Sequence, residues 1–172
     1  MRQQIIVSGI GGQGVLFLTR VIAQVAVNRH VPVLTAETHG MAQRGGTVLS
    51  TIKIGAFASP LVRSGQADVG LILWEANLPV HLSLLKPDGR LLVNAVDNGP
   101  GQRIDASGVA RNLGNAVLAN LVLLGFALKH QALPFAAEEC GLAIEQLAPG
   151  KYIEQNLKAF QSGLDYAAQA AS

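Results

Sequence analysis

The sequence predicts an α/β fold, in which a mostly parallel sheet is flanked by helices and the C-terminal part is helical. Three observations lead to this fold class. Short, often β-branched apolar runs alternate with segments of helical periodicity. A glycine turn joins the first strand to the first helix, as in Rossmann-like folds. The 172 residues, 49% of them apolar, suffice for one core, and no linker or repeat divides them. We therefore expect one domain, residues 1–172.

Apolar periodicity predicts the elements of the N-terminal half in order. A helix is expected from Gly12 to about Asn28, because apolar side chains recur there at i, i+3, i+4 and i+7. Pro32 suits the start of a strand, and the segment 38–46, with its three glycines, is expected to be a loop. Residues 55–65 are expected to be irregular. The expected strands of this half cover residues 4–8, 31–36, 47–54 and 69–74.

The C-terminal half is expected to be mainly helical after one more strand at residues 90–94. The sequence Lys86-Pro87-Asp88-Gly89 is typical of a turn that ends the preceding helix, and residues 96–105 are rich in turn formers. The segment 115–129 is apolar nearly all round, which places it in the core or between subunits. The expected helices cover residues 78–85, 115–129, 134–147 and 153–164.

Composition excludes several classes of protein. Only 14% of the residues are charged, the net charge is +2 and no basic tract occurs, so neither disorder nor nucleic-acid binding is indicated. The low charge content favours a buried subunit surface, hence a homo-oligomer when the chain is isolated. Cys140 is the single cysteine, so this chain alone holds no disulfide and no cysteine-ligated zinc or iron–sulfur centre. The longest apolar run is too short for a membrane span, and a cytoplasmic location without a membrane partner is expected.

The turn Gly9-Ile10-Gly11-Gly12-Gln13-Gly14 is the most informative motif. Its glycines permit a tight turn and a close helix–sheet contact, and the N–H groups at the start of the following helix suit a phosphate or carboxylate. Glu37 follows about twenty residues later, where dinucleotide-binding folds hold the ribose. A free-standing Rossmann-type nucleotide-binding protein is therefore one hypothesis. A tight turn with no ligand is another.

A second motif, Glu37-Thr38-His39-Gly40-Met41-Ala42-Gln43-Arg44-Gly45-Gly46, makes the pattern more specific. Together the two motifs resemble the gamma-type subunit of 2-oxoacid:ferredoxin oxidoreductases, which includes pyruvate and ketoisovalerate oxidoreductase gamma subunits and the indolepyruvate oxidoreductase beta subunit. The resemblance extends over nearly the whole chain. Further matching segments are Ala67-Asp68, Trp74-Glu75 and residues 156–163.

This resemblance implies a non-redox subunit of a multi-subunit enzyme. Enzymes of the family oxidatively decarboxylate a 2-oxoacid to an acyl-CoA, with thiamine diphosphate, Mg and iron–sulfur clusters, and pass electrons to ferredoxin. This chain has neither cluster cysteines nor a Gly-Asp-Gly thiamine motif. Those cofactors are therefore expected on partner subunits, with coenzyme A as co-substrate. No catalytic residue or metal ligand is assigned to this chain, and the isolated chain is expected to be inactive.

Within that picture the two motifs supply candidates for contact with an anion or ligand. Arg44 can hold a carboxylate or phosphate through two parallel hydrogen bonds, although a salt bridge between subunits is an equally simple role for it. Glu37 can hold a ribose or pair with Arg44. The candidates are Gly11, Gly12, Gln13, Gly14, Glu37, His39, Arg44, Gly45 and Gly46.

Other chemistry-bearing residues carry weaker signals. His30, His81 and His130 are expected on the surface or at helix ends. Ser8 and Ser50 have no base beside them in the sequence, so nucleophilic catalysis is not indicated. Trp74 is expected to be packed at a strand end. A third hypothesis is a pure interaction module that dimerises through the apolar helix around Leu121.

Overall fold

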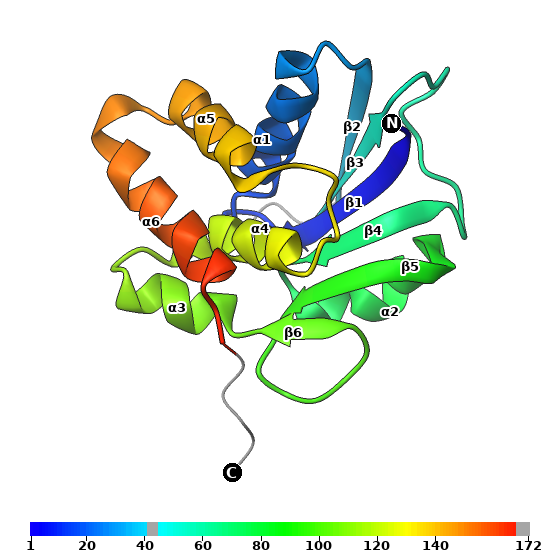
Figure 1. Cartoon of the computed structure of the whole chain (residues 1–172). Helices are drawn as coiled ribbons and strands as arrows, with labels where there is room; N and C mark the ends of the chain where they lie inside the picture. Colours follow the sequence, from blue (N-terminus) through cyan, green and yellow to red (C-terminus); the bar gives the residue numbers. More distant parts are fainter. Residues whose placement is uncertain (41–44, 168–172) are drawn as a thin grey trace.

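A six-stranded sheet lies at the centre of the computed structural model, which describes residues 1–40 and 45–167 (Figure 1). The strand order is β2-β3-β1-β4-β5-β6. Only β3 runs antiparallel to its neighbours, so the predicted mostly parallel α/β fold is confirmed. The strands are β1 (Gln3–Ile10), β2 (Val33–His39), β3 (Thr47–Ile54), β4 (Ala67–Ile72), β5 (Leu85–Asn94) and β6 (Gln102–Ile104).

Helices cover the two faces of the sheet unequally (Figure 1). Five helices pack on one face, where most buried apolar side chains gather. They are α1 (Val15–Asn28), α3 (Ala106–Asn112), α4 (Ala119–Lys129), α5 (Ala137–Leu147) and α6 (Ile153–Leu164). The other face carries α2 (Leu78–His81) between the 3-10 turns η1 (Glu75–Asn77) and η2 (Leu82–Leu84). Two more 3-10 turns, η3 (Ala116–Leu118) and η4 (Gly150–Tyr152), precede α4 and α6.

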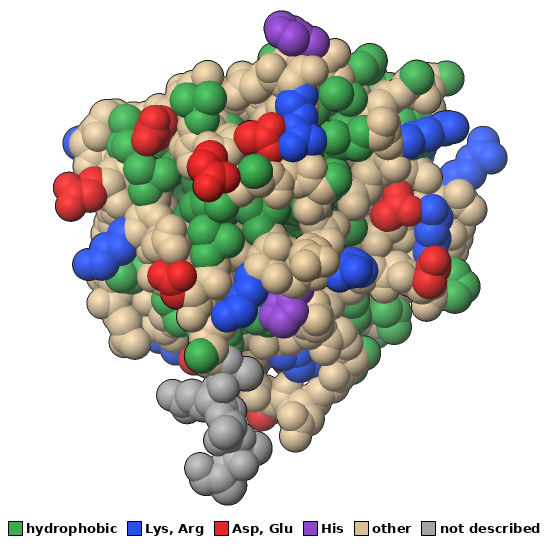
Figure 2. Space-filling model, in the orientation of Figure 1, with side chains coloured by type: hydrophobic (Ala, Val, Ile, Leu, Met, Phe, Trp, Pro, Cys, Tyr) green, Lys and Arg blue, Asp and Glu red, His purple; other side chains and the backbone are tan. Residues whose placement is uncertain are grey.

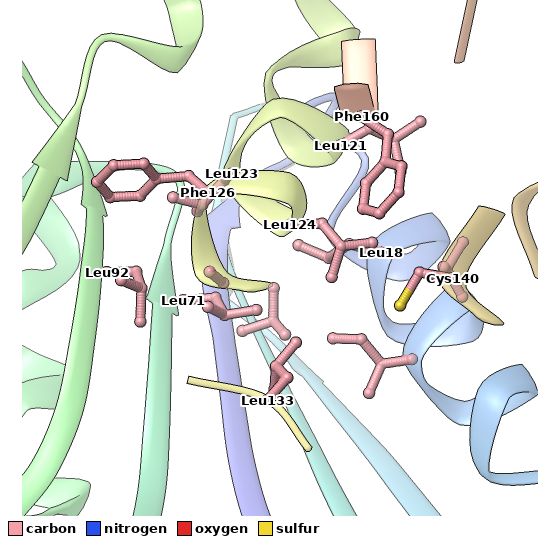
Figure 3. Packing of buried hydrophobic residues seen from close by; sticks show 14 of the residues in the cluster. Leu18, Leu71, Leu92, Leu121, Leu123, Leu124, Phe126, Leu133, Cys140 and Phe160 are labelled. Carbon is pink, nitrogen blue, oxygen red and sulfur yellow. The ribbon is translucent and has the colours of Figure 1, made fainter. Parts of the chain in front are cut away.

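Helix α4 is buried in the core of this chain, between the sheet and α6 (Figure 3). Leu121, Leu123 and Leu124 are at most 1% exposed. The helix is apolar all round because the sheet, α3 and α6 surround it. The hypothesis of a dimer formed through Leu121 is therefore wrong. No helix within the described residues is long and apolar enough to cross a bilayer.

Two glycines allow α4 and α6 to approach closely. A methyl group added at Gly125 of α4 would overlap the carbonyl oxygen of Phe160, and one added at Gly163 of α6 would overlap that of Val122. The two helix backbones are therefore in direct contact. The sequence showed the apolar faces of both helices but not this contact.

Strand β5 contains the segment that was expected to be a turn. Ala67 pairs with Leu85 and Val69 with Arg90, so Lys86–Gly89 forms a bulge inside β5. The expected helix over residues 78–85 is correspondingly shorter: α2 ends at His81, and β5 begins four residues later. The turn-forming residues were recognised correctly, but they bend a strand instead of joining two elements.

Several element boundaries differ from those expected. Helix α1 begins at Val15 and not at Gly12, β2 continues to His39, and α5 begins at Ala137 and not at Pro134. The turn-rich segment after β5 contains β6 and leads into α3. The Asp105 side chain caps α3 by accepting a hydrogen bond from the Gly108 amide at 2.7 Å.

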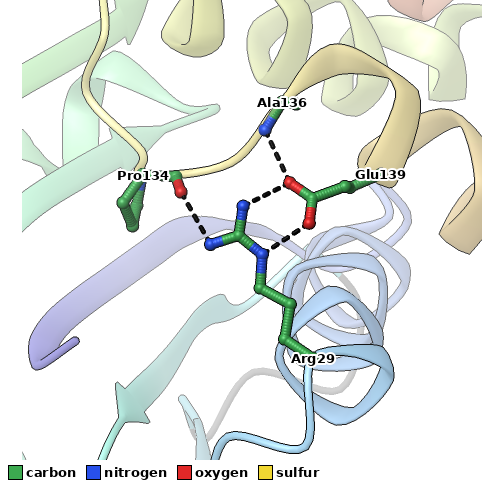
Figure 4. A network of polar contacts seen from close by, with 4 residues as sticks. All are labelled: Arg29, Pro134, Ala136 and Glu139. Atoms are coloured by element: carbon green, nitrogen blue, oxygen red, sulfur yellow. Dashed lines mark hydrogen bonds and ion pairs between the residues drawn. The ribbon is translucent and has the colours of Figure 1, made fainter.

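An ion pair fastens α1 to α5 (Figure 4). The Arg29 guanidinium donates to both carboxylate oxygens of Glu139 and to the Pro134 carbonyl, and Glu139 also accepts from the Ala136 amide at 2.8 Å. The pairing lowers the pKa of Glu139 and raises that of Arg29, mainly through the side-chain hydrogen bonds. A bidentate pair of this kind fixes the orientation of the two helices.

Candidate functional site

The glycine turn lies at the carboxyl edge of the sheet, between β1 and α1. Gly12 (φ 92°) and Gly14 (φ 72°) adopt left-handed conformations that favour glycine. Asn120 of α4 donates a 3.0 Å hydrogen bond to the Gly14 carbonyl, and a Cβ on Gly14 would collide with that amide. The sequence suggested that the glycines of this turn permit a close helix–sheet contact. In the structure, the absence of a side chain at Gly14 makes room for Asn120 of α4.

Gln13 is held by the protein itself. Its Oε1 accepts from the Ile10 amide at 2.9 Å, and its Nε2 donates to the Leu73 carbonyl at 3.2 Å. The Asn94 amide donates to the same carbonyl at 3.0 Å. The ends of β1, β4 and β5 are thus connected through two side-chain amides, which makes the turn a rigid part of this edge.

The second motif lies directly on the first. The Gly11 amide donates a 3.0 Å hydrogen bond to the Gly46 carbonyl, and Gly45 has a left-handed φ of 67° beside it. Gly11, Gly12 and Gly45 are exposed. Arg44, with Met41, Ala42 and Gln43, lies outside the described residues. The two motifs, 35 residues apart at Gly11 and Gly46, therefore form one structural unit.

Glu37 and His39 lie on β2, which β3 separates from the strand that leads into the glycine turn. β3 lies between β1 and β2, and Glu37 pairs in register with Ser50 of β3. Two strand spacings, about 10 Å, therefore separate the β1 and β2 axes. In a dinucleotide-binding fold the second strand is the immediate neighbour of the first. Glu37 instead lies near His39, whose Nε2 is 3.9 Å from the Glu37 carboxylate.

A buried polar cluster lies beneath the turn and was not predicted from the sequence. Asn77 of η1 donates to the Ser8 hydroxyl oxygen at 3.0 Å, and the Ser8 hydroxyl lies 2.7 Å from His81 Nδ1. The tautomer of His81 sets the direction of this second hydrogen bond: the Ser8 hydroxyl donates to Nδ1 when the ring proton is on Nε2. Burial lowers the pKa of His81, which favours the neutral ring.

This cluster shows where both residues lie. His81 is the last residue of α2, which agrees with the expected helix end, and it is buried. Ser8 has no base beside it in the sequence, but the fold brings the ring of His81, 73 residues away, to its hydroxyl. Ser8 is 0% exposed, so its hydroxyl is out of reach of a substrate and holds α2 against β1. No sequence signal could have paired these residues, because α2 returns under β1 only in the folded chain.

The end of β4 is exposed and charged. Trp74 is 45% exposed, so the expectation of a packed tryptophan is wrong. Glu75 accepts a 2.5 Å hydrogen bond from Arg103, at one side of a crevice of about 700 Å³ that also contains Arg111 and Asp105. Trp74 thus extends the exposed edge on which the glycine turn lies.

Cys140 is free and buried, and burial raises the pKa of its thiol to about 12. This confirms the expectation of a small apolar side chain. Among residues 1–40 and 45–167, no three His, Cys, Asp or Glu side chains converge as they would around a metal ion.

The paired glycine motifs, joined at one exposed edge, and the fold around them agree with one class of protein, a gamma-type subunit of 2-oxoacid oxidoreductases. A family model described as pyruvate ferredoxin/flavodoxin oxidoreductase matches residues 4–166, and the chain belongs to this family. It is therefore a subunit of the 2-oxoacid:ferredoxin oxidoreductase class, and the free-standing nucleotide-binding hypothesis is not favoured.

Similar proteins agree with this assignment. The chain is 31% identical to the indolepyruvate oxidoreductase subunit IorB of Archaeoglobus fulgidus, over 97% of this chain and 96% of that protein. The keto/oxoacid ferredoxin oxidoreductase gamma subunit of Geobacter sulfurreducens is 26% identical, with a TM-score of 0.76 over 95% of this chain and 96% of that one.

A third similarity concerns the fold alone. The 2-oxoglutarate:ferredoxin oxidoreductase of Magnetococcus marinus, solved with 2-oxoglutarate, coenzyme A and succinyl-CoA bound, is 18% identical with a TM-score of 0.76. The match covers 95% of this chain and 30% of that chain. The same fold therefore also occurs inside a longer polypeptide.

Proposed function

We propose that the edge formed by the glycine turn and Gly45–Gly46 lines the path of coenzyme A or the 2-oxoacid in the assembled enzyme. The observation that carries this proposal is the hydrogen bond from Gly11 to Gly46, which unites both motifs at an exposed edge. The adjoining N-terminus of α1 has no side-chain cap and no acidic residue in its first turn. Its positive end is thus available to a carboxylate or phosphate.

The reaction itself takes place on partner subunits in this proposal. Thiamine diphosphate with Mg would supply the decarboxylation chemistry there, iron–sulfur clusters the route for electrons to ferredoxin, and coenzyme A would be the acyl acceptor. The residues of this chain orient an anionic group and exclude water at one side of that path. The complex is placed in the cytoplasm, and the isolated chain is expected to be inactive and to self-associate.

Arg44 is the proposed charged contact of this edge, on the evidence of the sequence alone. It stands two residues before Gly46 in the chain, and Gly46 accepts the Gly11 hydrogen bond. Its guanidinium suits the same carboxylate or phosphate groups as the start of α1. Glu37 and His39, on β2, are proposed as a secondary polar contact at the side of this edge.

The variant Gly11→Ala tests the proposal in the reconstituted complex. A Cβ at Gly11 has only ordinary contacts, 3.6 Å from the Gly45 amide nitrogen, so the variant is expected to fold normally. An added methyl obstructs any group that approaches the turn, and we expect the KM for coenzyme A or the 2-oxoacid to rise about tenfold. The control is Gly141→Ala on α5, where the added methyl is 3.9 Å from Leu157.

Arg44→Ala completes the test. A rise in the same KM supports a ligand-facing edge. Full turnover with unchanged KM values in both Gly11→Ala and Arg44→Ala would show that the edge is only structural, and the chain a scaffold.

A further inference from the structure

The face of the sheet opposite the five helices has a thin cover. The segments 57–66 and 75–84 lie on it and are joined by hydrogen bonds from Gly65 to the Ser83 carbonyl (2.9 Å) and from Gln66 to the Leu84 carbonyl (3.0 Å). We call these two segments the α2 surface. Three of its apolar side chains point to solvent: Leu61 is 62% exposed, Val80 68% and Leu82 42%.

A mostly parallel sheet is ordinarily buried on both faces. Beneath the α2 surface lies an apolar cluster formed by Ile6, Ala67, Ile72, Leu78, Leu85, Leu91 and Val93. A helix of four residues and two 3-10 turns are its only helical cover among the described residues. The exposed apolar side chains above it are therefore suited to contact with another protein.

A hollow of about 540 Å³ opens beside Leu82. Its walls include Leu82, Leu85 and Leu91. Lys86 and Arg90 also line it, but the Lys86 ammonium pairs with Asp68 and the Arg90 guanidinium donates to the His130 carbonyl. Apolar walls fit a bulky apolar side chain. Anchor residues of protein interfaces occupy pockets of this kind.

The charges of the α2 surface are positive. Arg2 and Lys53 stack on Phe57, with the guanidinium carbon 4.3 Å and the ammonium nitrogen 5.0 Å from the ring centroid. Within the described part of the chain, neither of them nor the exposed Arg63 forms an ion pair. Of the nearby acidic side chains, Asp68 is paired with Lys86 and Glu75 with Arg103. Asp88 is exposed between two residues that line the hollow.

We propose that the α2 surface is the docking site for a partner subunit of the oxidoreductase, which places an apolar side chain in the hollow and carboxylates opposite the exposed Arg63 and Arg2. The inference rests on the proposed function only in that the chain works inside a complex. The glycine turn itself lies at the carboxyl edge of the sheet and is not part of the α2 surface.

A second copy of this chain is a poorer occupant. Two copies joined symmetrically through the α2 surface would bring like charges together. Acidic side chains gather on the opposite side of the molecule, over α5 and α6 (Figure 2), where Glu138, Glu145 and Glu154 are exposed. A head-to-tail contact between the two surfaces would not close and would continue into a filament.

Hydrogen–deuterium exchange on the free chain and on the complex purified from its host maps the contact. We expect slower exchange in the complex over residues 57–66 and 78–84, with no change over α5. Unchanged exchange over both α2-surface segments, or protection confined to α5 and α6, would overturn the proposal.

Two variants test the same contact by affinity. Val80→Asp and Arg63→Glu alter exposed side chains, so both are expected to retain the wild-type Tm. Each should weaken binding to the partner subunits by at least about tenfold in sedimentation experiments. Leu142→Asp makes the matched change at an exposed leucine of α5 and should bind normally.

The outcomes separate this inference from the proposed function. Normal assembly of Val80→Asp and Arg63→Glu overturns the docking site, even if Gly11→Ala raises the KM. If these two variants fail to assemble while Gly11→Ala leaves the KM values unchanged, the results support the docking site and contradict the ligand-facing edge. A free chain that is a dimer and that Val80→Asp converts to a monomer would assign the α2 surface to a second copy, against the proposal.

Discussion

The side-chain amide of Asn77 donates a 2.8 Å hydrogen bond to the carbonyl oxygen of Gly9, in the first motif. Its Oδ1 accepts from the hydroxyl of Thr47, directly after the second motif, at 3.3 Å. One buried residue of η1 therefore binds both motifs from below, while the Gly11–Gly46 hydrogen bond joins them above. The geometry of the proposed ligand edge depends on a residue outside both motifs.

Asn77→Ala should destabilise the chain by about 2 kcal/mol, because it leaves buried polar groups of Gly9 and Ser8 without a donor. Urea unfolding followed by circular dichroism measures this loss. Asn98→Ala, at an exposed asparagine, is the control and should be neutral. Equal stability of the two variants would show that Asn77 does not hold the motifs.

Gly163→Ala should destabilise the chain by about 3 kcal/mol, since the added methyl overlaps the Val122 carbonyl oxygen and forces α6 away from α4. Gly141→Ala makes the same change in the middle of α5, where there is room. It should leave stability unchanged or raise it by about 0.5 kcal/mol, because alanine is the better helix former. Thermal unfolding of both variants measures the difference. A Gly163→Ala variant as stable as wild type would contradict the close approach of the two helices.

His81 should make the chain less stable in mildly acidic solution. Burial lowers the pKa of His81 below 6.5, so in mild acid its imidazole binds a proton more readily in the unfolded chain than in the folded chain. The penalty is absent above the unfolded pKa and grows as the pH falls through about 6.5 towards the folded pKa. Burial also lowers the pKa of His130, so His130 destabilises the chain in the same pH range. It is present both in wild type and in the His81 variant tested below, so its effect cancels in the comparison.

The Tm of wild type and of His81→Gln is therefore to be compared between about pH 7.5 and pH 5.5. The variant should lose less of its Tm over this interval. His30→Gln, at an exposed histidine, should behave as wild type does. The same pH dependence in wild type and His81→Gln would contradict a buried neutral imidazole.

The dinucleotides NAD, NADP and FAD should not bind the purified chain. Titration with NAD, NADP and FAD is expected to show no saturable binding at micromolar concentrations, because β3 separates Glu37 from the glycine turn. Micromolar binding of any of the three would restore the nucleotide-binding hypothesis.

The sequence predicted those parts of the fold that depend on local periodicity. The strands around Ile6, Ile52 and Leu92 follow from short apolar runs, and the helix around Val21 follows from a repeat of 3.6 residues. The helix around Leu124 follows from a longer segment that is apolar nearly all round. It did not predict that β3 would lie between β1 and β2, since strand order depends on tertiary packing. The bulge at Lys86–Gly89 was not predicted for the same reason. The turn-forming residues can be recognised locally, but their pairing with Ala67–Val69 depends on the tertiary fold.

The candidate site was predicted in part. Both glycine motifs stood out by spacing and composition, and the structure joins Gly11 to Gly46. The amides that hold them come from Gln13 in the turn itself and from three other elements, with Asn77 in η1, Asn94 in β5 and Asn120 in α4. Isolated asparagines give no sequence signal, so this support could be recognised only after the elements had been placed.

The most direct test of the central claim, that this chain serves a catalyst supplied by other subunits, is turnover. Oxidation of a 2-oxoacid with coenzyme A and ferredoxin should be measured for this chain alone, for its partner subunits alone and for both together. We expect no turnover by the chain alone and full turnover only by the assembled complex. Turnover by the purified chain alone would contradict the claim.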